Sequence, residues 1–413
     1  MLLLIATVTC SVVYGQSGNI HLSWRGTNGA DPQHTMAITW NSVSKNAGVV
    51  SYGTDSSGLD HRKLGKKIKV TSDAGKSFNF KAELTGLKPG TRYYYQCGGG
   101  KDKSSPVYSF LTAPLEGATG KFVIGVWGDT QNNAGNLAFE QTLVIVNRLA
   151  KHPIELSIHM GDIVENGSVA NSWFNFLRIA EPVTAKAPFM PAMGNHDVVN
   201  KSSDPHFQEP FRIFYDSFNL PKDQLNYSYD YGNIHFVVVN SGFAQGAAKV
   251  GSVLLDKNSA TYKWLEQDLA AAKGNKNITW TIFYAHYPVH SFGVSHIPEW
   301  QNNLAPLLDK YGVDLCLTGH RHVYERHKAI QFDVADEQKD THVYDHPKGT
   351  VFITNGSSGG SLQGIGGSKM SSMVYTADKK VYTYAIMTVE GDRLLYDVYD
   401  QNDERIDFFS ILK

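Results

Sequence analysis

Gly319-His320-Arg321-His322 comes just after the apolar run Val313–Leu317, and this pairing of a buried strand with a polar motif recurs along the chain. The other pairs, in chain order, are Phe122–Trp127 with Gly128-Asp129-Thr130-Gln131, Leu156–Met160 with Gly161-Asp162, Phe189–Met193 with Gly194-Asn195-His196-Asp197, and Trp280–Tyr284 with Ala285-His286. Loops that leave the carboxyl ends of strands in an open α/β sheet converge on one crevice. Two Asp, one Asn and three His side chains are therefore expected to meet in space.

Amphipathic segments with a helical period separate these strands. The predicted helices are Asn136–Lys151, Val169–Ala180, Ala260–Lys273 and Pro298–Tyr311. In the first of them Leu137, Phe139, Leu143, Val146 and Leu149 form a common stripe. The pattern predicts an α/β domain with a central mixed sheet or β-sandwich and helices on its outer faces.

Residues 20–113 show a different pattern, because short alternating strands and Gly- or Asn-rich turns replace the helical period. This is typical of an all-β sandwich. The stretch Leu84–Tyr95 resembles the corner of fibronectin type III domains in which a Leu plugs the core and a Tyr anchors the next strand. Tyr108–Pro114 is expected to be the closing strand and Leu115–Gly120 a linker.

Length, charge and the amino terminus narrow the class of protein. A chain of 413 residues favours two domains, and a net charge of -1 leaves no basic surplus for binding nucleic acid.

Residues 1–15 are short and apolar, which indicates a secretory signal peptide and a secreted or extracytoplasmic protein. No later apolar run reaches the roughly 20 residues that a membrane-spanning helix needs. Five Asn-x-Ser/Thr triplets, at Asn166, Asn200, Asn226, Asn277 and Asn355, are acceptors for glycosylation if the host modifies exported chains.

The donors suit a pair of divalent or trivalent metal ions, held about 3.5–4 Å apart around a phosphate. At least one carboxylate must bridge such a pair, and Asp162 is the motif carboxylate that ligands of both ions flank. Asp129, Gln131 and His322 would complete the first ion, and Asn195, His286 and His320 the second. A hydroxide shared by the metals would be the nucleophile, because bound metal lowers the pKa of water from about 15.7 toward about 7.

His196 adjoins a predicted ligand without needing to bind metal itself. It is suited to protonate the leaving oxygen of an ester, with Asp197 tuning its charge.

The order of the motifs resembles that of the metallophosphoesterase (calcineurin-like) superfamily over about Lys121–Leu412. Within it, Gly319-His320-Arg321-His322-Val323-Tyr324-Glu325-Arg326 looks like the His-x-His-x-Tyr-Glu-Arg signature of purple acid phosphatases, and the Asn195 motif and the loop Thr354–Gly360 are similar too. The resemblance implies a four-layer β-sandwich flanked by helices, preceded by the fibronectin type III-like domain that large members carry. It implies a secreted, metal-dependent phosphohydrolase divided into a signal peptide (1–15), an N-terminal domain (16–115) and a catalytic domain (120–413).

Two positions depart from that family. Purple acid phosphatases carry a Tyr three residues after the bridging Asp, where it binds ferric iron and gives the colour, but this chain has Glu165. The Gly that usually stands two residues after the first Asp is Gln131. We expect Gln131 to supply a ligand, with Glu165 either a second candidate or a solvated loop carboxylate. Without the phenolate, a colourless site with Zn, Mn or Fe(II) is favoured.

His290 and His296 follow His286 in the loop where, in the resembling family, His side chains face the substrate. We take both as catalytic candidates, and the alternative is that each is a surface His on a loop.

The leading functional hypothesis is a phosphomonoesterase that acts on a small-molecule ester without a nucleic-acid partner or a membrane span. The alternative is a phosphodiesterase or nucleotide pyrophosphatase, since the same ions serve both ester classes. A third hypothesis, from another class, is a binding protein with a decayed site. It conflicts with the presence of every predicted ligand of the second metal.

Overall fold

The computed structural model describes residues 17–25, 30–72, 75–99, 104–132, 139–198, 212–221, 224–241, 256–291, 298–338, 340–364, 371–377 and 380–413. The predicted signal peptide, the glycosylation acceptor Asn200 and the catalytic candidate His296 lie outside these residues.

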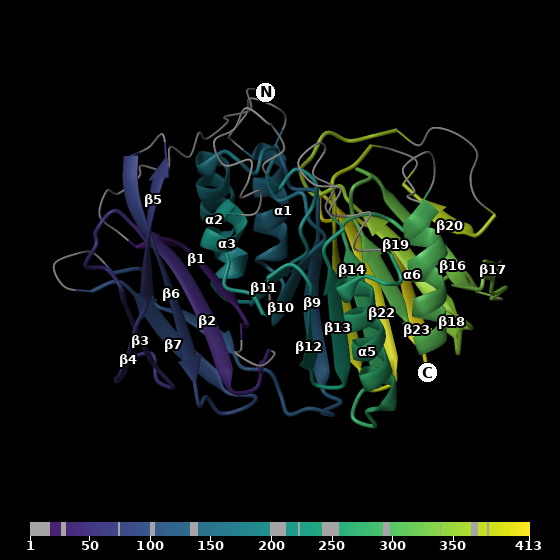
Figure 1. The fold of residues 1–413 in the computed structure, drawn as a ribbon, viewed down its shortest axis with the longest axis horizontal. Coiled ribbons are helices and arrows are strands. Elements are labelled where there is room, and N and C mark those ends of the chain that lie inside the picture. The colour runs from purple at the N-terminus through teal and green to yellow at the C-terminus, as the bar shows by residue number, and fades with distance from the viewer. Residues whose placement is uncertain are drawn as a thin grey trace.

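The N-terminal part consists of two antiparallel four-stranded sheets packed face to face (Figure 1). One sheet has the order β1 (Gly18–Ser23), β2 (Thr35–Ser42), β6 (Gly75–Thr85), β5 (Lys66–Ser72), and the other β4 (His61–Leu64), β3 (Val49–Gly53), β7 (Arg92–Cys97), β8 (Tyr108–Leu111). Stacked rings of Trp40 and Phe80, 5.4 Å apart, fill the space between them. The Tyr93 hydroxyl accepts a hydrogen bond from the Lys88 amide at 3.0 Å, which anchors the turn into β7.

The second part also contains two sheets. The first has the order β11 (Phe189–Pro191), β10 (Leu156–His159), β9 (Lys121–Trp127), β21 (Thr383–Glu390), β22 (Arg393–Asp400), β23 (Arg405–Leu412), β18 (Val343–Asp345). The second has the order β12 (Tyr227–Tyr231), β13 (Ile234–Val239), β14 (Trp280–Ala285), β15 (Leu315–Thr318), β19 (Thr350–Asn355), β16 (Tyr324–Gln331), β17 (Val334–Ala335), with β20 (Met373–Thr376) paired to β16. Among the strands that precede the motifs, β9, β10 and β11 run parallel to one another, and so do β14 and β15, so the carboxyl ends within each set share one edge.

Helices cover both outer faces. The structure has α1 (Glu140–Leu149), α2 (Ala170–Thr184), the short α3 (Arg212–Ser217), α5 (Ala260–Gly274) and α6 (Pro298–Tyr311). In Figure 1, α2 and α3 lie between the N-terminal sheets and the first sheet of the second part, whereas α5 and α6 cover the second sheet. This arrangement confirms the prediction of an all-β domain followed by an α/β domain.

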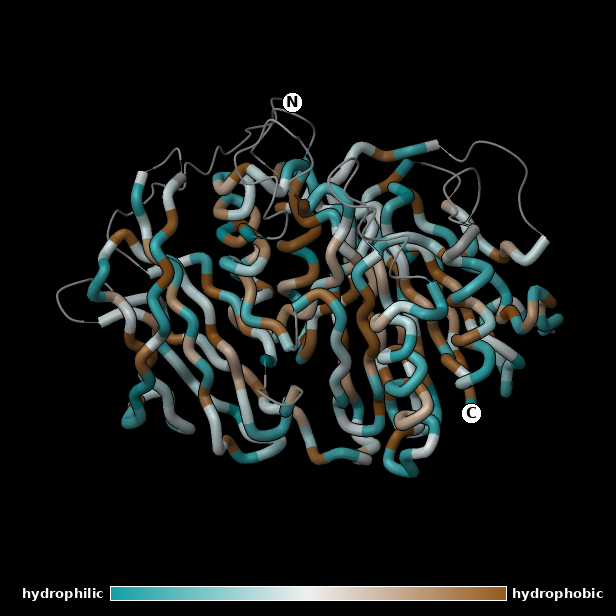
Figure 2. The backbone as a smooth tube through the Cα atoms, viewed as in Figure 1, coloured by the Kyte–Doolittle hydropathy of each residue, from teal (hydrophilic) through white to brown (hydrophobic). Residues whose placement is uncertain are grey.

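The inner strands are buried on both faces, as parallel strands between helices and a second sheet must be. In β14, Ile282 and Tyr284 face the core between the sheets, whereas Phe283 and Ala285 face a second apolar cluster under α5 and α6. Figure 2 shows hydrophobic residues running along these central strands.

The first helix buries Val146 and Leu149 of the predicted stripe but differs from the prediction at Leu143. Leu143 was assigned to the apolar stripe but is 41% exposed, and the buried positions include Thr142, Val146 and Leu149. The Thr142 hydroxyl donates a hydrogen bond of 2.8 Å to the Thr130 carbonyl. This polar contact accounts for the burial of Thr142 beneath the loop of Asp129.

Candidate metal centre

The predicted ligands gather at one edge of the two sheets. Asp129, Asp162, Asn195 and His286 follow the carboxyl ends of β9, β10, β11 and β14, and His320 follows β15. All five come from parallel strands that end side by side, which is why residues so distant in the chain meet.

Three of these residues adopt a left-handed backbone conformation, with φ of 54° at Asp129, 51° at Asp162 and 68° at His320. Such values are uncommon for residues other than Gly and cluster at functional sites. The surrounding structure holds them: the Asp129 amide donates to the Gly161 carbonyl at 2.9 Å, and the His320 amide to Asp129 Oδ1 at 2.7 Å. The chain is thus bent so that these side chains point into the crevice.

Two groups of candidate ligands share one carboxylate. Asp162, His286 and His320 form one group, and Asp129, Asp162 and His322 form the other, with ligand atoms within 4.8 Å of one another in each. Asp162 is the residue common to both groups.

In the group that contains His286 and His320, the amide oxygen of Asn195 lies 3.0 Å from His286 Nε2 and 3.1 Å from His320 Nδ1. His286 Nε2 is also 3.2 Å from Asp162 Oδ2. The Met160 carbonyl lies 2.8 Å from His286 Nδ1, so that nitrogen carries the proton and the Nε2 lone pair faces the crevice.

The group that contains Asp129 and His322 is arranged in the same way. His322 Nε2 lies 3.5 Å from Asp129 Oδ1, and its Nδ1 is 2.7 Å from the Ser361 carbonyl. Gln131 Nε2 is 2.9 Å from His322 Nε2 and 3.2 Å from Asp162 Oδ2. A flip of the amide would aim Gln131 Oε1 at these groups instead, and the two assignments differ only in the positions of O and N.

These residues fit a pair of cations. In the described part of the chain, Asp129 Oδ2 and Gln131 Oε1 are buried without a hydrogen-bond partner. Buried oxygens without a donor cost free energy unless a cation or another partner satisfies them. Oxygen and imidazole donors together are the set expected for Fe, Zn or Mn.

The electrostatics of the site agree with metal binding. Burial, and then the neighbouring Asp162, raise the pKa of Asp129 well above its usual range. Burial opposes the ionisation of Asp162, but His286 and His196 outweigh it and lower that pKa. Burial also lowers the pKa of His320 to about 3, which keeps its imidazole neutral, as a ligand must be.

The glycines of two motifs are required by close approach. A Cβ on Gly194 would lie 2.1 Å from Asp162 Oδ1, and one on Gly319 would lie 2.2 Å from Asp129 Oδ2. Both distances are far inside van der Waals contact, so larger residues would displace the carboxylates.

His196 lies at the rim of the centre, with Nε2 4.0 Å from Asp162 Oδ2. The Glu165 carbonyl accepts from its Nδ1 at 2.9 Å, and the Glu165 carboxylate lies 3.6 Å from the same nitrogen. Burial lowers the pKa of His196, but Asp162, Glu165 and Asp197 together outweigh burial and raise it.

Asp197 has a different main role from the one expected. One of its oxygens accepts from the Ile163 and Val164 amides at 2.8 and 3.1 Å, and the other from the Gly194 amide at 2.8 Å. The carboxylate therefore ties the loop of Asp162 to that of Asn195. Its influence on His196 is the smallest of the charges that raise that pKa.

Glu165 and His290 fall outside both ligand groups. Glu165 is half-buried beside His196. The His290 ring is buried and lies edge-on to Phe352, with centroids 4.5 Å apart. Phe352 belongs to the cluster under α5 and α6, so His290 is packed into that apolar layer.

Sequence reasoning missed Tyr287, whose half-buried ring lies 4.1 Å from the His320 ring. Its position directly after His286 was the available signal. It also missed the Met160 and Ser361 carbonyls that orient two imidazoles, and backbone atoms leave no mark in a sequence. Arg326 forms a buried ion pair, with Nε 2.8 Å from Asp407 Oδ2.

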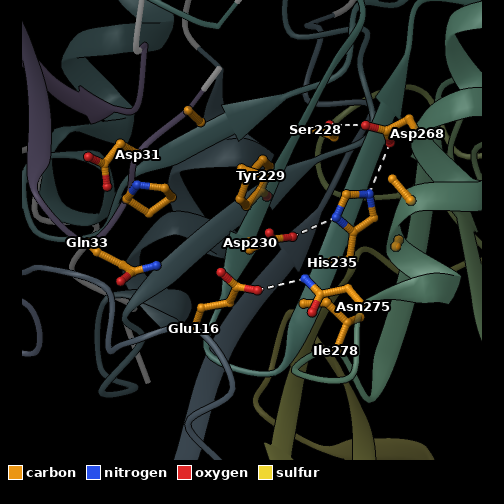
Figure 3. A pocket seen from close by; sticks show the side chains of 14 residues that line it. Asp31, Gln33, Glu116, Ser228, Tyr229, Asp230, His235, Asp268, Asn275 and Ile278 are labelled. Carbon is orange, nitrogen blue, oxygen red and sulfur yellow. Dashed lines mark hydrogen bonds and ion pairs between the residues drawn. The ribbon is translucent and has the colours of Figure 1, made fainter. Parts of the chain in front are cut away.

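A separate cavity of about 400 Å³ lies between the N-terminal sheets, the linker and α5 (Figure 3). None of the candidate metal ligands lines it. On its wall His235 is held between two carboxylates, 2.6 Å from Asp230 and 3.0 Å from Asp268.

Comparisons with known proteins agree with this geometry. Residues 18–112 match the purple acid phosphatase N-terminal domain, and residues 122–324 match the calcineurin-like phosphoesterase domain. The chain is 26% identical over 363 residues to purple acid phosphatase 21 of Arabidopsis thaliana, covering 84% of this chain and 72% of the relative. It is 28% identical over 365 residues to acid phosphatase type 7 of Mus musculus, covering 82% and 77% of the two chains.

The fold is similar to that of the purple acid phosphatase PPD1 from yellow lupin seeds, with a TM-score of 0.79 and 20% identity over 96% of this chain and 74% of that one. The matches to the two domain families together span most of the chain and confirm the resemblance carried by the motifs. The protein is a metal-dependent phosphatase, a purple acid phosphatase-like member of the calcineurin-like metallophosphoesterase superfamily.

Proposed function

We propose that the protein is a phosphomonoesterase that hydrolyses small-molecule phosphate esters at the centre around Asp162. The observation that carries the proposal is that two ligand groups share this one carboxylate while His196 stands beside it. A pair of cations, when bound, activates water and neutralises the charge of the phosphate.

The chain's own residues supply orientation and a proton. Asp162 would be shared by both cations, Asp129, Gln131 and His322 would hold one of them, and Asn195, His286 and His320 would hold the other. Since His196 Nδ1 is engaged by the Glu165 carbonyl, its Nε2 is the atom free to protonate the leaving oxygen.

The metals are proposed to be Fe, Zn or Mn without a ferric phenolate. Glu165 occupies the position of the family's ligating Tyr, and its carboxylate is directed to His196. Gln131 is the proposed additional ligand. Elemental analysis of the purified protein tests the metal pair.

A phosphodiesterase or nucleotide pyrophosphatase activity is the alternative, because the same ligands serve diesters. Comparing turnover of p-nitrophenyl phosphate with that of bis-p-nitrophenyl phosphate distinguishes them. The proposal holds if the monoester has the larger kcat/KM, and the alternative holds if the diester does. A binding protein with a decayed site would turn over neither substrate, whatever metal is added.

We further propose that the chain is secreted, with residues 1–15 as signal peptide, 16–115 as a fibronectin type III-like domain and 120–413 as the catalytic domain. Among the described helices, none has the length and apolar character needed to cross a membrane. Of the potential glycosylation acceptors, Asn277 is exposed, whereas Asn226 and Asn355 are buried. Among the acceptors that the structure describes, Asn277 is therefore best placed for modification.

A further inference from the structure

Side chains of the N-terminal sheets donate a row of hydrogen bonds to the end of α3. The five consecutive backbone carbonyls of residues 215–219 each accept from a side chain of the N-terminal part. Lys81 donates to Tyr215 and Phe218, Asn79 to Asp216 at 3.1 Å, His21 to Ser217 at 2.8 Å, and Ser23 to Asn219 at 2.8 Å. The donors belong to β1 and β6, which lie on either side of β2.

These hydrogen bonds satisfy backbone carbonyls at the C-terminal end of α3. The last four carbonyls of a helix lack partners within it, and a cation near them is stabilised by the helix dipole. Lys81 supplies that cation to two of the carbonyls. Burial lowers its pKa to about 8, with Asp216 opposing the effect, so the ammonium is drawn partly out of water to make these contacts.

From α3 a packed path leads to the metal centre. The Phe218 ring lies 5.3 Å from His21 and 5.9 Å from Trp173. The Trp173 indole donates to the Gly167 carbonyl at 3.1 Å, and the Gly167 amide donates to the His196 carbonyl at 2.7 Å. The path thus ends on the backbone of the proposed acid.

The loop of Gly167 and the loop of His196 are tightly packed against each other. A Cβ on Gly167 would lie 2.2 Å from the Asp197 carbonyl oxygen, so the two loops touch backbone to backbone. A shift of Trp173 would therefore move the loop that carries His196. The ligand imidazoles, in contrast, are oriented by the Met160 and Ser361 carbonyls within the catalytic part.

We propose that the N-terminal sandwich is a positioning element for the reaction: Lys81, with Asn79 and His21, fixes α3, and α3 fixes His196 through Phe218, Trp173 and Gly167. The inference rests on the proposed function, in which His196 protonates the leaving oxygen. Lys81 touches neither substrate nor metal and acts only through this path.

The test compares Lys81→Met in the full metal-loaded chain with Lys81→Arg, which restores a cation, and with Lys67→Met, which changes an exposed lysine on the adjacent strand β5. Turnover is measured on p-nitrophenyl phosphate, whose leaving group needs little protonation, and on an alkyl phosphate, whose leaving group needs it. General acids contribute about 10²–10⁴-fold to such steps, and partial misplacement should cost about tenfold. Lys81→Met is expected to lose about tenfold in kcat on the alkyl ester and less than about twofold on p-nitrophenyl phosphate, with metal content unchanged.

A second readout does not depend on activity. Hydrogen exchange at the Gly167 amide should become faster in Lys81→Met and stay unchanged in Lys67→Met, because the bond to His196 is loosened. Lys81→Arg should restore both readouts in part. If Lys81→Met does not fold, Asn79→Ala serves in its place, since it removes the bond to the Asp216 carbonyl, together with the one that Asn79 accepts from Asn41, and leaves the cation.

Equal losses on both esters, or an unchanged Gly167 amide, would overturn the positioning role. An inactive wild-type protein would instead overturn the proposed function, and the exchange measurement would still decide whether α3 is coupled to the His196 loop.

Discussion

Asp162 Oδ2 lies 3.2 Å from His286 Nε2, which joins the loop after β10 to the loop after β14 across the junction of the two sheets. The contact places the carboxylate of one sheet against an imidazole of the other. Ligands from both sheets are thereby brought together, and the metal centre depends on the sheets keeping this relation.

His196→Ala should slow hydrolysis in a way that depends on the leaving group. If His196 protonates the leaving oxygen, kcat on an alkyl phosphate falls by about 10²-fold or more, and kcat on p-nitrophenyl phosphate falls much less. Steady-state kinetics on both esters check this. A uniform loss would mean that His196 holds the phosphate or the metals instead.

Gly194→Ala should abolish metal binding, because its Cβ would lie 2.1 Å from Asp162 Oδ1 and push the bridging carboxylate away. Gly274→Ala is the matched control, since a Cβ there meets nothing within 4 Å. The control should keep its metals and gain up to about 1 kcal/mol of helix stability. Metal content and thermal unfolding of both variants provide the test, and full metal occupancy in Gly194→Ala would refute the packing argument.

The wild-type protein should show no strong visible absorption band. Glu165 stands where a Tyr would bind ferric iron, and its carboxylate lies 3.6 Å from His196 Nδ1. A visible spectrum of the metal-loaded protein is the check. An intense band would show that another phenolate has taken the place of that ligand.

The free energy of unfolding should fall at alkaline pH, because His235 then loses its proton. Burial lowers its pKa, but the hydrogen bonds that its ring donates to Asp230 and Asp268 outweigh burial and raise the pKa from 6.5 to about 9. A folded-state pKa above the unfolded one gives stability that is fully present below about pH 6.5 and is lost as the pH rises through about 9. The contribution is about 1–3 kcal/mol.

The free energy of unfolding, measured by denaturant titration at pH 6 and at pH 9.5, tests this in the wild type and in His235→Asn. The difference between the two proteins should shrink at the higher pH. A difference that is the same at both values would show that His235 is neutral in the folded protein.

The sequence was sufficient to predict that these side chains gather, because strand ends in an α/β fold meet at one edge and the motifs stand at those ends. It could not predict what Asp197 does, since its partners are the Ile163, Val164 and Gly194 amides and any residue could supply them. His290 is similar: only the packed structure shows its ring against Phe352. The hydrogen bonds from Lys81 to the Tyr215 and Phe218 carbonyls are harder still to predict from sequence, because the donor lies in the N-terminal all-β part and the acceptors lie in the α/β part.

The most direct test of a shared Asp162 is the metal stoichiometry of the wild type and of Asp162→Ala, measured by elemental analysis after purification, with the exposed Asp60→Ala as control. We expect two metal ions per chain in the wild type and in the control. Asp162→Ala should bind neither ion stably and should lose activity while remaining folded. A folded Asp162→Ala variant that retains two ions and full turnover would contradict the account.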